Sequence, residues 1–118
     1  MAEIVWSPRA IKDIDEIANY ISKDSLQYAQ AQTRLFFSAT EILEKYPYRG
    51  RVVPELGIAN IRQLLSGHYR IIYEVFTKDK IGILTVHHQA RLLKNNPAMR
   101  IRLRKRGKLL ELAFMNWV

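Results

Sequence analysis

The hydrophobic pattern of this sequence changes its period once, near residue 60, and this change limits the folds that the chain can adopt. Before that point, apolar residues recur every three or four positions, as in an α-helix. After it, short runs rich in β-branched and aromatic residues follow one another, as in a β-sheet. Between the two lies PYRGRVVPELGIAN, whose two prolines and two glycines are typical of a loop.

The first half of the chain predicts a short strand and two helices. EIVW, near the N-terminus, reads as the strand, and Ser7-Pro8 supplies an N-cap and a first-turn proline for the first helix. Ser25 is a second N-cap, and Pro47 stops the helix that it opens. The two helices are expected to form an antiparallel hairpin with one apolar side. In the second helix we predict that this side consists of Tyr28, Ala31, Leu35, Ala39, Ile42, Leu43 and Tyr46.

The second half predicts three antiparallel strands in a meander, at residues 60–66, 68–76 and 81–88, with connections short enough for hairpins. The fold class is therefore α+β: an antiparallel sheet in the chain order strand-helix-helix-strand-strand-strand, with the helical hairpin packed on one face. Alternation along the middle strand divides its side chains between two faces. The predicted core face holds Tyr69, Ile71, Tyr73 and Val75, and the predicted open face holds Arg70, Ile72, Glu74 and Phe76.

Length and composition indicate one compact domain in a reducing compartment. The chain has 118 residues, 48% of them hydrophobic, and no cysteine, so a disulfide framework and a thiolate metal site are excluded. The start, MAEIVWSPRA, does not resemble a signal peptide, and no apolar run approaches the roughly 20 residues that span a membrane. We expect a cytoplasmic protein that does not enter a membrane.

Positive charge is concentrated at the C-terminal end. Of the net charge of +8, the last 25 residues carry +6, with seven basic residues and one acidic residue. Such a segment attracts nucleic acid, a ribosome or an acidic protein partner, but it is also what a solvated extension without a specific role looks like. Its final stretch, LLELAFMNWV, is mostly apolar and fits either a packed helix or an incidental extension.

Few residues of this chain belong to a recognisable catalytic pattern. A glycine-rich phosphate loop, an HExxH metal motif and a serine-nucleophile elbow are all absent from the sequence, so we expect neither a metal nor a cofactor. What remains is a set of arginines with one carboxylate and the histidines. That set suits RNA cleavage without metal, in which Glu55 or His88 acts as base or acid and Arg70 holds the phosphate. The same arginines suit simple phosphate contact, an acidic protein partner or a solvated charged face.

The doublet in VHHQAR raises the question of whether two histidines act together. In a regular strand His87 shares a face with Ile83 and Thr85, whereas His88 shares the other face with Leu84. At most one of them therefore lies on the open face, unless the strand bulges there. We predict a functional role for His88, with Arg91 nearby, and a structural role for His87.

Taken together, four stretches resemble the RelE/ParE superfamily of toxins from type II toxin–antitoxin systems, most closely the ParE branch of plasmid stabilisation proteins. They are WSPRAIKDIDEIANYI, YPYRGRVVPEL, IRQLLSGHYRIIYEV and IGILTVHHQARLL, in this order from residue 6 to residue 93. The resemblance implies a toxin domain over residues 1–93, followed by a basic and apolar extension over residues 94–118. It also implies a cognate antitoxin as partner, with a toxin–antitoxin heterotetramer as one form of the complex.

For the activity, the resemblance implies inhibition of DNA gyrase by protein contact, as associated with ParE-like members. The alternative is ribosome-dependent, metal-independent mRNA cleavage of the RelE type, for which the matching catalytic positions are Glu55, Arg70 and His88. Gln89 stands where a tyrosine often follows that histidine, and this difference favours the ParE type. Contacts to the target or to nucleic acid are expected from Arg51, Arg62, Arg91, Arg102 and Arg104.

Overall fold

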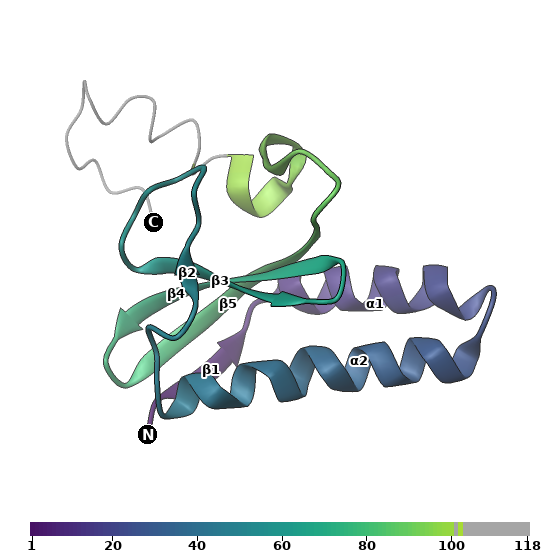
Figure 1. Ribbon diagram of the computed structural model, residues 1–118, viewed down its shortest axis with the longest axis horizontal. Helices are drawn as coiled ribbons and strands as arrows, with labels where there is room; N and C mark the ends of the chain where they lie inside the picture. Colours follow the sequence, from purple (N-terminus) through teal and green to yellow (C-terminus); the bar gives the residue numbers. More distant parts are fainter. Residues whose placement is uncertain (101, 103–118) are drawn as a thin grey trace.

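The computed structural model describes residues 1–100 and 102, and in this part of the chain a five-stranded sheet packs against a helical hairpin (Figure 1). The elements follow in the order β1 (Glu3–Trp6), α1 (Pro8–Ser22), α2 (Leu26–Thr40), the 3-10 helix η1 (Glu41–Glu44), β2 (Arg51–Val52), β3 (Ile61–Ser66), β4 (Tyr69–Thr77), β5 (Lys80–His88) and the 3-10 helix η2 (Leu93–Asn95). Among the described residues, no helix is both long and apolar enough to cross a membrane.

Both helices begin directly after Ser7 and Ser25, the two serines that were predicted as N-caps. The Ser7 hydroxyl accepts a hydrogen bond from the backbone N–H of Ala10 at 3.0 Å, and the Ser25 hydroxyl accepts one from Tyr28 at 3.0 Å. Each bond satisfies an N–H that the first helical turn leaves without an intrahelical partner. Pro8 occupies the first turn of α1, where its missing N–H has no consequence.

The α+β class is confirmed, and the sheet is mixed. In space the strands follow the order β1-β5-β4-β3-β2, and β1 lies parallel to β5 at the far end from β2. The β3–β4 and β4–β5 pairings are antiparallel, as predicted. The β2–β3 pairing is also antiparallel, but β2 lies in the segment that was predicted to be a loop. Strands that lie parallel need a crossover connection, and here the chain between β1 and the meander includes the helical hairpin, which crosses one face of the sheet.

The main core lies between the sheet and the hairpin. The predicted core face of β4 is confirmed, because Ile71, Tyr73 and Val75 are buried there and Tyr69 packs at its margin. Phe36 of α2 is fully buried in the same cluster and contacts the Tyr69 ring edge-on, with 5.3 Å between the ring centroids.

The predicted apolar side of the second helix is wrong for most of its members. Tyr28, Leu35 and Ile42 are exposed by 60, 55 and 40%, and Tyr46 is exposed as well. The side chains that face the sheet lie one position further along the chain, at residues 29 and 36 in place of 28 and 35. Leu43, which belongs to the predicted set, also faces the sheet. The buried series consists of Ala29, Gln32, Phe36, Thr40 and Leu43. Residues 28, 35, 42 and residues 29, 36, 43 both repeat every seven positions, so periodicity alone does not distinguish them.

The opposite face of the sheet was predicted to be open, and this prediction is also wrong. A second apolar cluster covers it, contributed by the loop after β2, by the sheet itself and by the chain beyond β5. Its members are Val53, Leu56, Ile61, Ile72, Leu84, Leu93 and Met99. The predicted extension from Lys94 thus begins against the body of the protein, with Asn96 and Met99 both buried. The rest of that extension, including Arg104 and LLELAFMNWV, lies outside the described residues.

Candidate functional site

Two of the three predicted catalytic side chains meet on the face of the sheet away from the helices. Arg70 projects from β4, and its guanidinium donates to both carboxylate oxygens of Glu55, at 2.9 and 2.8 Å. Glu55 lies in the turn that follows β2, where the Leu56 N–H donates to the Val53 carbonyl at 3.0 Å. A third bond, at 3.0 Å, joins Arg70 to the side-chain oxygen of Gln63 on β3.

The electrostatics of this cluster favour a fixed ion pair. The hydrogen bonds from Arg70 hold the pKa of Glu55 below its ordinary value, against the opposing effect of partial burial. A carboxyl group with a lowered pKa is a poor general acid near neutral pH. Arg70 is largely buried, with 11% of its side chain exposed, and its guanidinium already has three short bonds. Binding a phosphate there would require breaking the pair.

The two histidines at the end of β5 lie on opposite faces, but the faces are exchanged relative to the prediction. Ile72 of β4 pairs with Thr85, and the next residue, Tyr73, pairs with Ile83, so Leu84 is an extra residue in β5. Such a bulge reverses the side-chain alternation beyond it.

As a result, His87 lies opposite Arg70, and His88 lies opposite Tyr69 on the helix face. The predicted grouping of His88 with Leu84 is therefore wrong. The structure does not bring His88 together with Glu55 and Arg70.

His87 has a structural environment on both sides of its ring. Its Nε2 contacts the Arg91 carbonyl at 2.9 Å, and its Nδ1 contacts the side-chain nitrogen of Asn96 at 3.0 Å. The Asn96 amide also donates to the Thr85 hydroxyl at 3.0 Å, and that hydroxyl donates to Asp13 of α1. The chain of bonds crosses the sheet from α1 to the segment after η2 and uses both imidazole nitrogens.

His88 is half-buried beside other aromatic rings. Its ring is parallel to that of His68 at 6.2 Å and perpendicular to that of Tyr69 at 5.2 Å. Its Nδ1 accepts a hydrogen bond from the Ala90 N–H at 3.0 Å, which closes the turn after β5. These contacts fit a residue that ends a strand and shields the edge of the core.

The remaining predicted arginines have separate environments. Arg51 and Arg91 are exposed. Arg62 is bonded to three backbone carbonyls and lies over a tyrosine ring, so it holds a loop in place. Arg102 contacts the Glu74 carboxylate at 3.6 Å and donates to the Ala98 carbonyl at 2.9 Å. Arg104 lies outside the described part of the chain.

Sequence reasoning missed Asn96 and Asp13, which connect the two faces through Thr85. A partial signal was present for Asn96, because an asparagine before a proline is a common helix N-cap. Its side-chain oxygen indeed accepts from the Ala98 N–H at 2.9 Å. Nothing in the sequence indicated that its amide nitrogen would meet Thr85 and His87.

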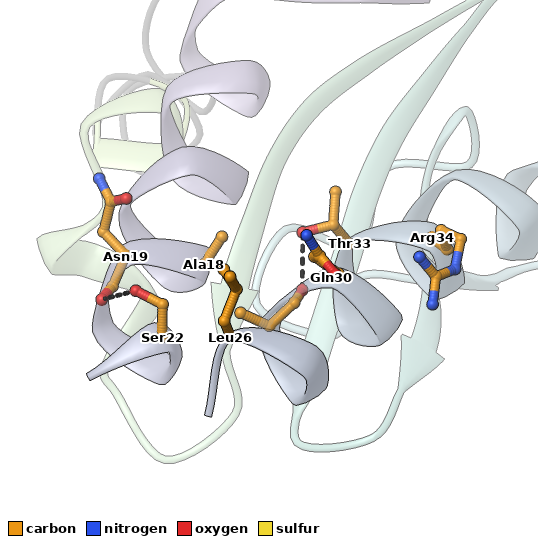
Figure 2. A pocket seen from close by; sticks show the side chains of 8 residues that line it. Ala18, Asn19, Ser22, Leu26, Gln30, Thr33 and Arg34 are labelled. Carbon is orange, nitrogen blue, oxygen red and sulfur yellow. Dashed lines mark hydrogen bonds between the residues drawn. The ribbon is translucent and has the colours of Figure 1, made fainter. Parts of the chain in front are cut away.

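A groove of about 470 Å³ lies between α1 and α2, and neither Glu55 nor Arg70 lines it (Figure 2). Two of the hydroxyls that line it are bonded within their own helices: Ser22 donates to the Asn19 carbonyl at 2.9 Å and Thr33 to the Ala29 carbonyl at 3.0 Å. Its other lining residues are Ala18, Leu26, Gln30 and Arg34. This set contains no nucleophile with an adjacent base, so it does not form a hydrolytic site.

Comparison with known proteins identifies the family. Residues 4–93 match the family model described as ParE toxin of type II toxin-antitoxin system, parDE. The chain is 33% identical over 92 residues to Toxin RelE2 of Caulobacter vibrioides, an alignment that covers 78% of this chain and all of that protein.

The fold resembles a solved structure titled Chromosomal ParDE TA system from P. aeruginosa. The TM-score is 0.62 at 19% identity, over 75% of this chain and 96% of that one. This likeness agrees with the strand order and helical hairpin seen here. The chain therefore belongs to the ParE toxin family of type II toxin–antitoxin systems.

Proposed function

We propose that this toxin inhibits DNA gyrase by protein–protein contact and does not cleave RNA. The observation that carries the proposal is the separation of the candidate catalytic groups. Arg70 is bonded to Glu55 and Gln63 on one face of the sheet, and His88 lies on the other face. Family membership supports gyrase as the proposed target, since inhibition of gyrase is the activity associated with ParE-like toxins.

The chemistry of RNA cleavage explains why this separation matters. Without a metal, a base must take the 2′-hydroxyl proton, a cation must stabilise the phosphate, and an acid must protonate the leaving oxygen, all around one phosphorus atom. His87 lies on the same face as Arg70, but both of its ring nitrogens are engaged. Inhibition by contact needs no such constellation.

Two assays with the purified toxin test the proposal in parallel. The first measures supercoiling of relaxed plasmid by gyrase, and the second measures cleavage of mRNA on ribosomes. We expect loss of supercoiling and intact mRNA. His88→Ala and Glu55→Gln should reduce the inhibition of gyrase by no more than about threefold, because neither residue acts as a catalyst.

His68→Ala is the matched control, since it removes an exposed neighbouring imidazole. Cleaved mRNA that disappears in His88→Ala but not in His68→Ala would establish the nuclease alternative and overturn the proposal. Supercoiling that proceeds normally at a large excess of folded toxin would equally reject the gyrase target.

We also propose that the antitoxin binds the exposed apolar series on α2 and η1. Tyr28, Leu35 and Ile42 are spaced by seven residues and are exposed by 40 to 60%. This spacing suits the apolar face of a partner helix. Membership of a toxin–antitoxin family supports the presence of such a partner.

Leu35→Gln tests this surface. We expect it to weaken antitoxin binding at least about tenfold, as for a central interface residue, without lowering the melting temperature. Gln30→Ala, on the same helix but outside the series, is the control. Unchanged affinity of Leu35→Gln in isothermal titration calorimetry would exclude the series from the interface.

The proposed target also implies a cytoplasmic site of action, because gyrase acts on the chromosome. For the complex in which the antitoxin neutralises the toxin, we propose a heterotetramer of the two proteins. The mass of the co-purified complex, measured by light scattering, tests this stoichiometry directly.

A further inference from the structure

Residues 45–51, which lead from η1 into β2, place cations and aromatic rings together on the surface. The sequence is KYPYRGR, and in Figure 1 it forms the connection between the end of the helical hairpin and the sheet. Tyr46 and Tyr48 are exposed by 51 and 53%. The exposed side chains of the segment are those of Lys45, Tyr46, Tyr48, Arg49 and Arg51. Large exposed rings beside several cations indicate a binding surface.

The backbone of this segment is fixed by a tight turn and by a buried anchor. The Arg49 N–H donates to the Tyr46 carbonyl at 3.1 Å, across a turn with Pro47 in its second position. One residue further, the Gly50 N–H donates to the buried Tyr73 hydroxyl at 2.8 Å. A Cβ atom on Gly50 would lie only 2.5 Å from a carbonyl oxygen of β3, so only glycine fits against the sheet here.

Arg62 of β3 supports the segment from the side. Its guanidinium donates to the carbonyls of Tyr48 at 3.3 Å and Gly50 at 3.0 Å, and it lies 5.0 Å from the centre of the Tyr48 ring. A further bond of 2.8 Å to the Ala59 carbonyl holds the arginine itself. The backbone that carries the exposed rings and cations is therefore held in place, which reduces the entropy lost on binding.

The cations of the segment are not neutralised by described carboxylates, and Lys45 Nζ lies over the Tyr46 ring at 5.7 Å from its centroid. Among the described residues, the carboxylates that form ion pairs do so with Arg9, Arg70 and Arg102, and none of them pairs with Lys45, Arg49 or Arg51. Glu41 and Glu44 of η1 precede the segment in sequence, but their oxygens form no ion pair with it.

We propose that residues 45–51 bind single-stranded nucleic acid. Tyr46 and Tyr48 stack on unpaired bases, and Lys45, Arg49 and Arg51 contact the phosphates on either side. An acidic peptide would satisfy the cations but would leave both rings unused, whereas an unpaired strand uses both kinds of group. This activity goes beyond inhibition of a protein target, because it gives the toxin its own contact with a nucleic acid.

The test is fluorescence anisotropy of a labelled twelve-nucleotide oligothymidylate with the full-length chain. In the triple variant Lys45→Gln, Arg49→Gln, Arg51→Gln, we expect the slope of log K against log salt to become shallower by about 2, since each phosphate contact contributes about 0.7. Tyr46→Leu and Tyr48→Leu should each weaken binding at least about fivefold through loss of stacking.

A matched control removes the same charge from exposed positions elsewhere: Lys12→Gln, Lys23→Gln, Lys78→Gln. The control should bind with an affinity within about twofold of the wild type. Its salt slope should lie within about 0.5 of the wild-type slope, and these margins allow for the general effect of net charge. Circular dichroism melting of each variant shows that the fold is retained.

Three results would overturn the proposal. The first is the absence of binding by the wild-type chain. The second is loss of binding in Arg102→Gln, Arg104→Gln while the 45–51 variants bind normally, which assigns the contact to the C-terminal segment. The third is equal competition by polyglutamate together with no effect of the two tyrosine variants, which assigns the surface to an acidic peptide.

Discussion

Two arginine–glutamate pairs lie on the same face of β4, and the carboxyl groups in them have pKa values shifted in opposite directions. In the first pair, two hydrogen bonds of 2.8 and 2.9 Å from Arg70 lower the pKa of Glu55. In the second pair, burial raises the pKa of Glu74, and Arg102, at 3.6 Å, only partly opposes it. The exposed fractions of the two glutamate side chains are 38 and 12%.

This comparison teaches that geometry and solvent decide what an ion pair contributes. The first carboxylate keeps some hydration and has two aligned donors, so its charged form is favoured. The Glu74 carboxylate has lost most of its hydration and has one longer contact with Arg102, so its charged form is disfavoured even beside a cation. The first pair is suited to hold a loop against the sheet, and the second is a conditional contact that depends on pH.

The largest predicted effect comes from breaking the first pair. Arg70→Met removes three hydrogen bonds and leaves the Gln63 oxygen buried without its partner, so we expect the free energy of unfolding to fall by about 2 kcal/mol at pH 7. Urea denaturation measures this loss. Arg51→Met, at an exposed position, is the control and should change the value by less than about 0.5 kcal/mol. An unchanged midpoint for Arg70→Met would show that the pair does not contribute to stability.

Breaking the second pair should have a smaller effect that depends on pH. Arg102→Met leaves the Glu74 carboxylate buried without its cation, and we expect a loss of about 1.5 kcal/mol at pH 7. Because the penalty falls on the charged form only, the loss should shrink as the pH falls through the raised pKa of Glu74 and the group becomes neutral. Equal losses at pH 7 and pH 4 would contradict this explanation.

Sequence reasoning predicted the elements of the fold well because their signals are local. Ser7-Pro8 and Ser25 act within one helical turn, and the alternation that defines the middle strands is a property of the backbone itself. The side of α2 that faces the sheet is not local, since two apolar series compete for it. Closure of the other face also depends on residues distant in sequence, such as Val53 and Met99.

The candidate site was predictable only in part, for a similar reason. Glu55 and Arg70 were each predicted from the sequence as catalytic candidates, but their bidentate contact joins residues fifteen positions apart and exists only in the fold. The exchange of His87 and His88 follows from one extra residue at Leu84. A bulge of this kind has no clear sequence signature when every residue around it favours a strand.

Removing the second carboxylate should stabilise the protein slightly. The pKa of Glu74 is raised in the folded state, so its ionisation destabilises the fold as the pH rises from the ordinary value of 4.5 through the folded value. Glu74→Gln removes this term, and we expect a gain of about 1 kcal/mol at pH 7 and none at pH 4. Thermal unfolding at the two pH values measures it. A loss of stability at pH 7 would show that the attraction to Arg102 exceeds the burial penalty.

The smallest predicted effect comes from neutralising the first carboxylate, and its pH dependence has the opposite sign. The pKa of Glu55 is lowered in the folded state, so its stabilising contribution is complete above 4.5 and is lost as the pH falls through the folded value. Because this carboxylate is more than a third exposed, solvent screening limits the loss in Glu55→Gln to about 0.5 kcal/mol at pH 7. A glutamine at this position can still accept a hydrogen bond from Arg70, so the variant removes the negative charge of the pair and keeps its geometry. Urea denaturation of this variant and of Glu74→Gln, from pH 7 to pH 3, should give stability differences from the wild type that start with opposite signs. Each difference should shrink as the pH falls through the folded pKa of its carboxyl group. A gain of stability in both variants would mean that burial controls both carboxylates, and a loss in both would mean that attraction to the arginines controls both.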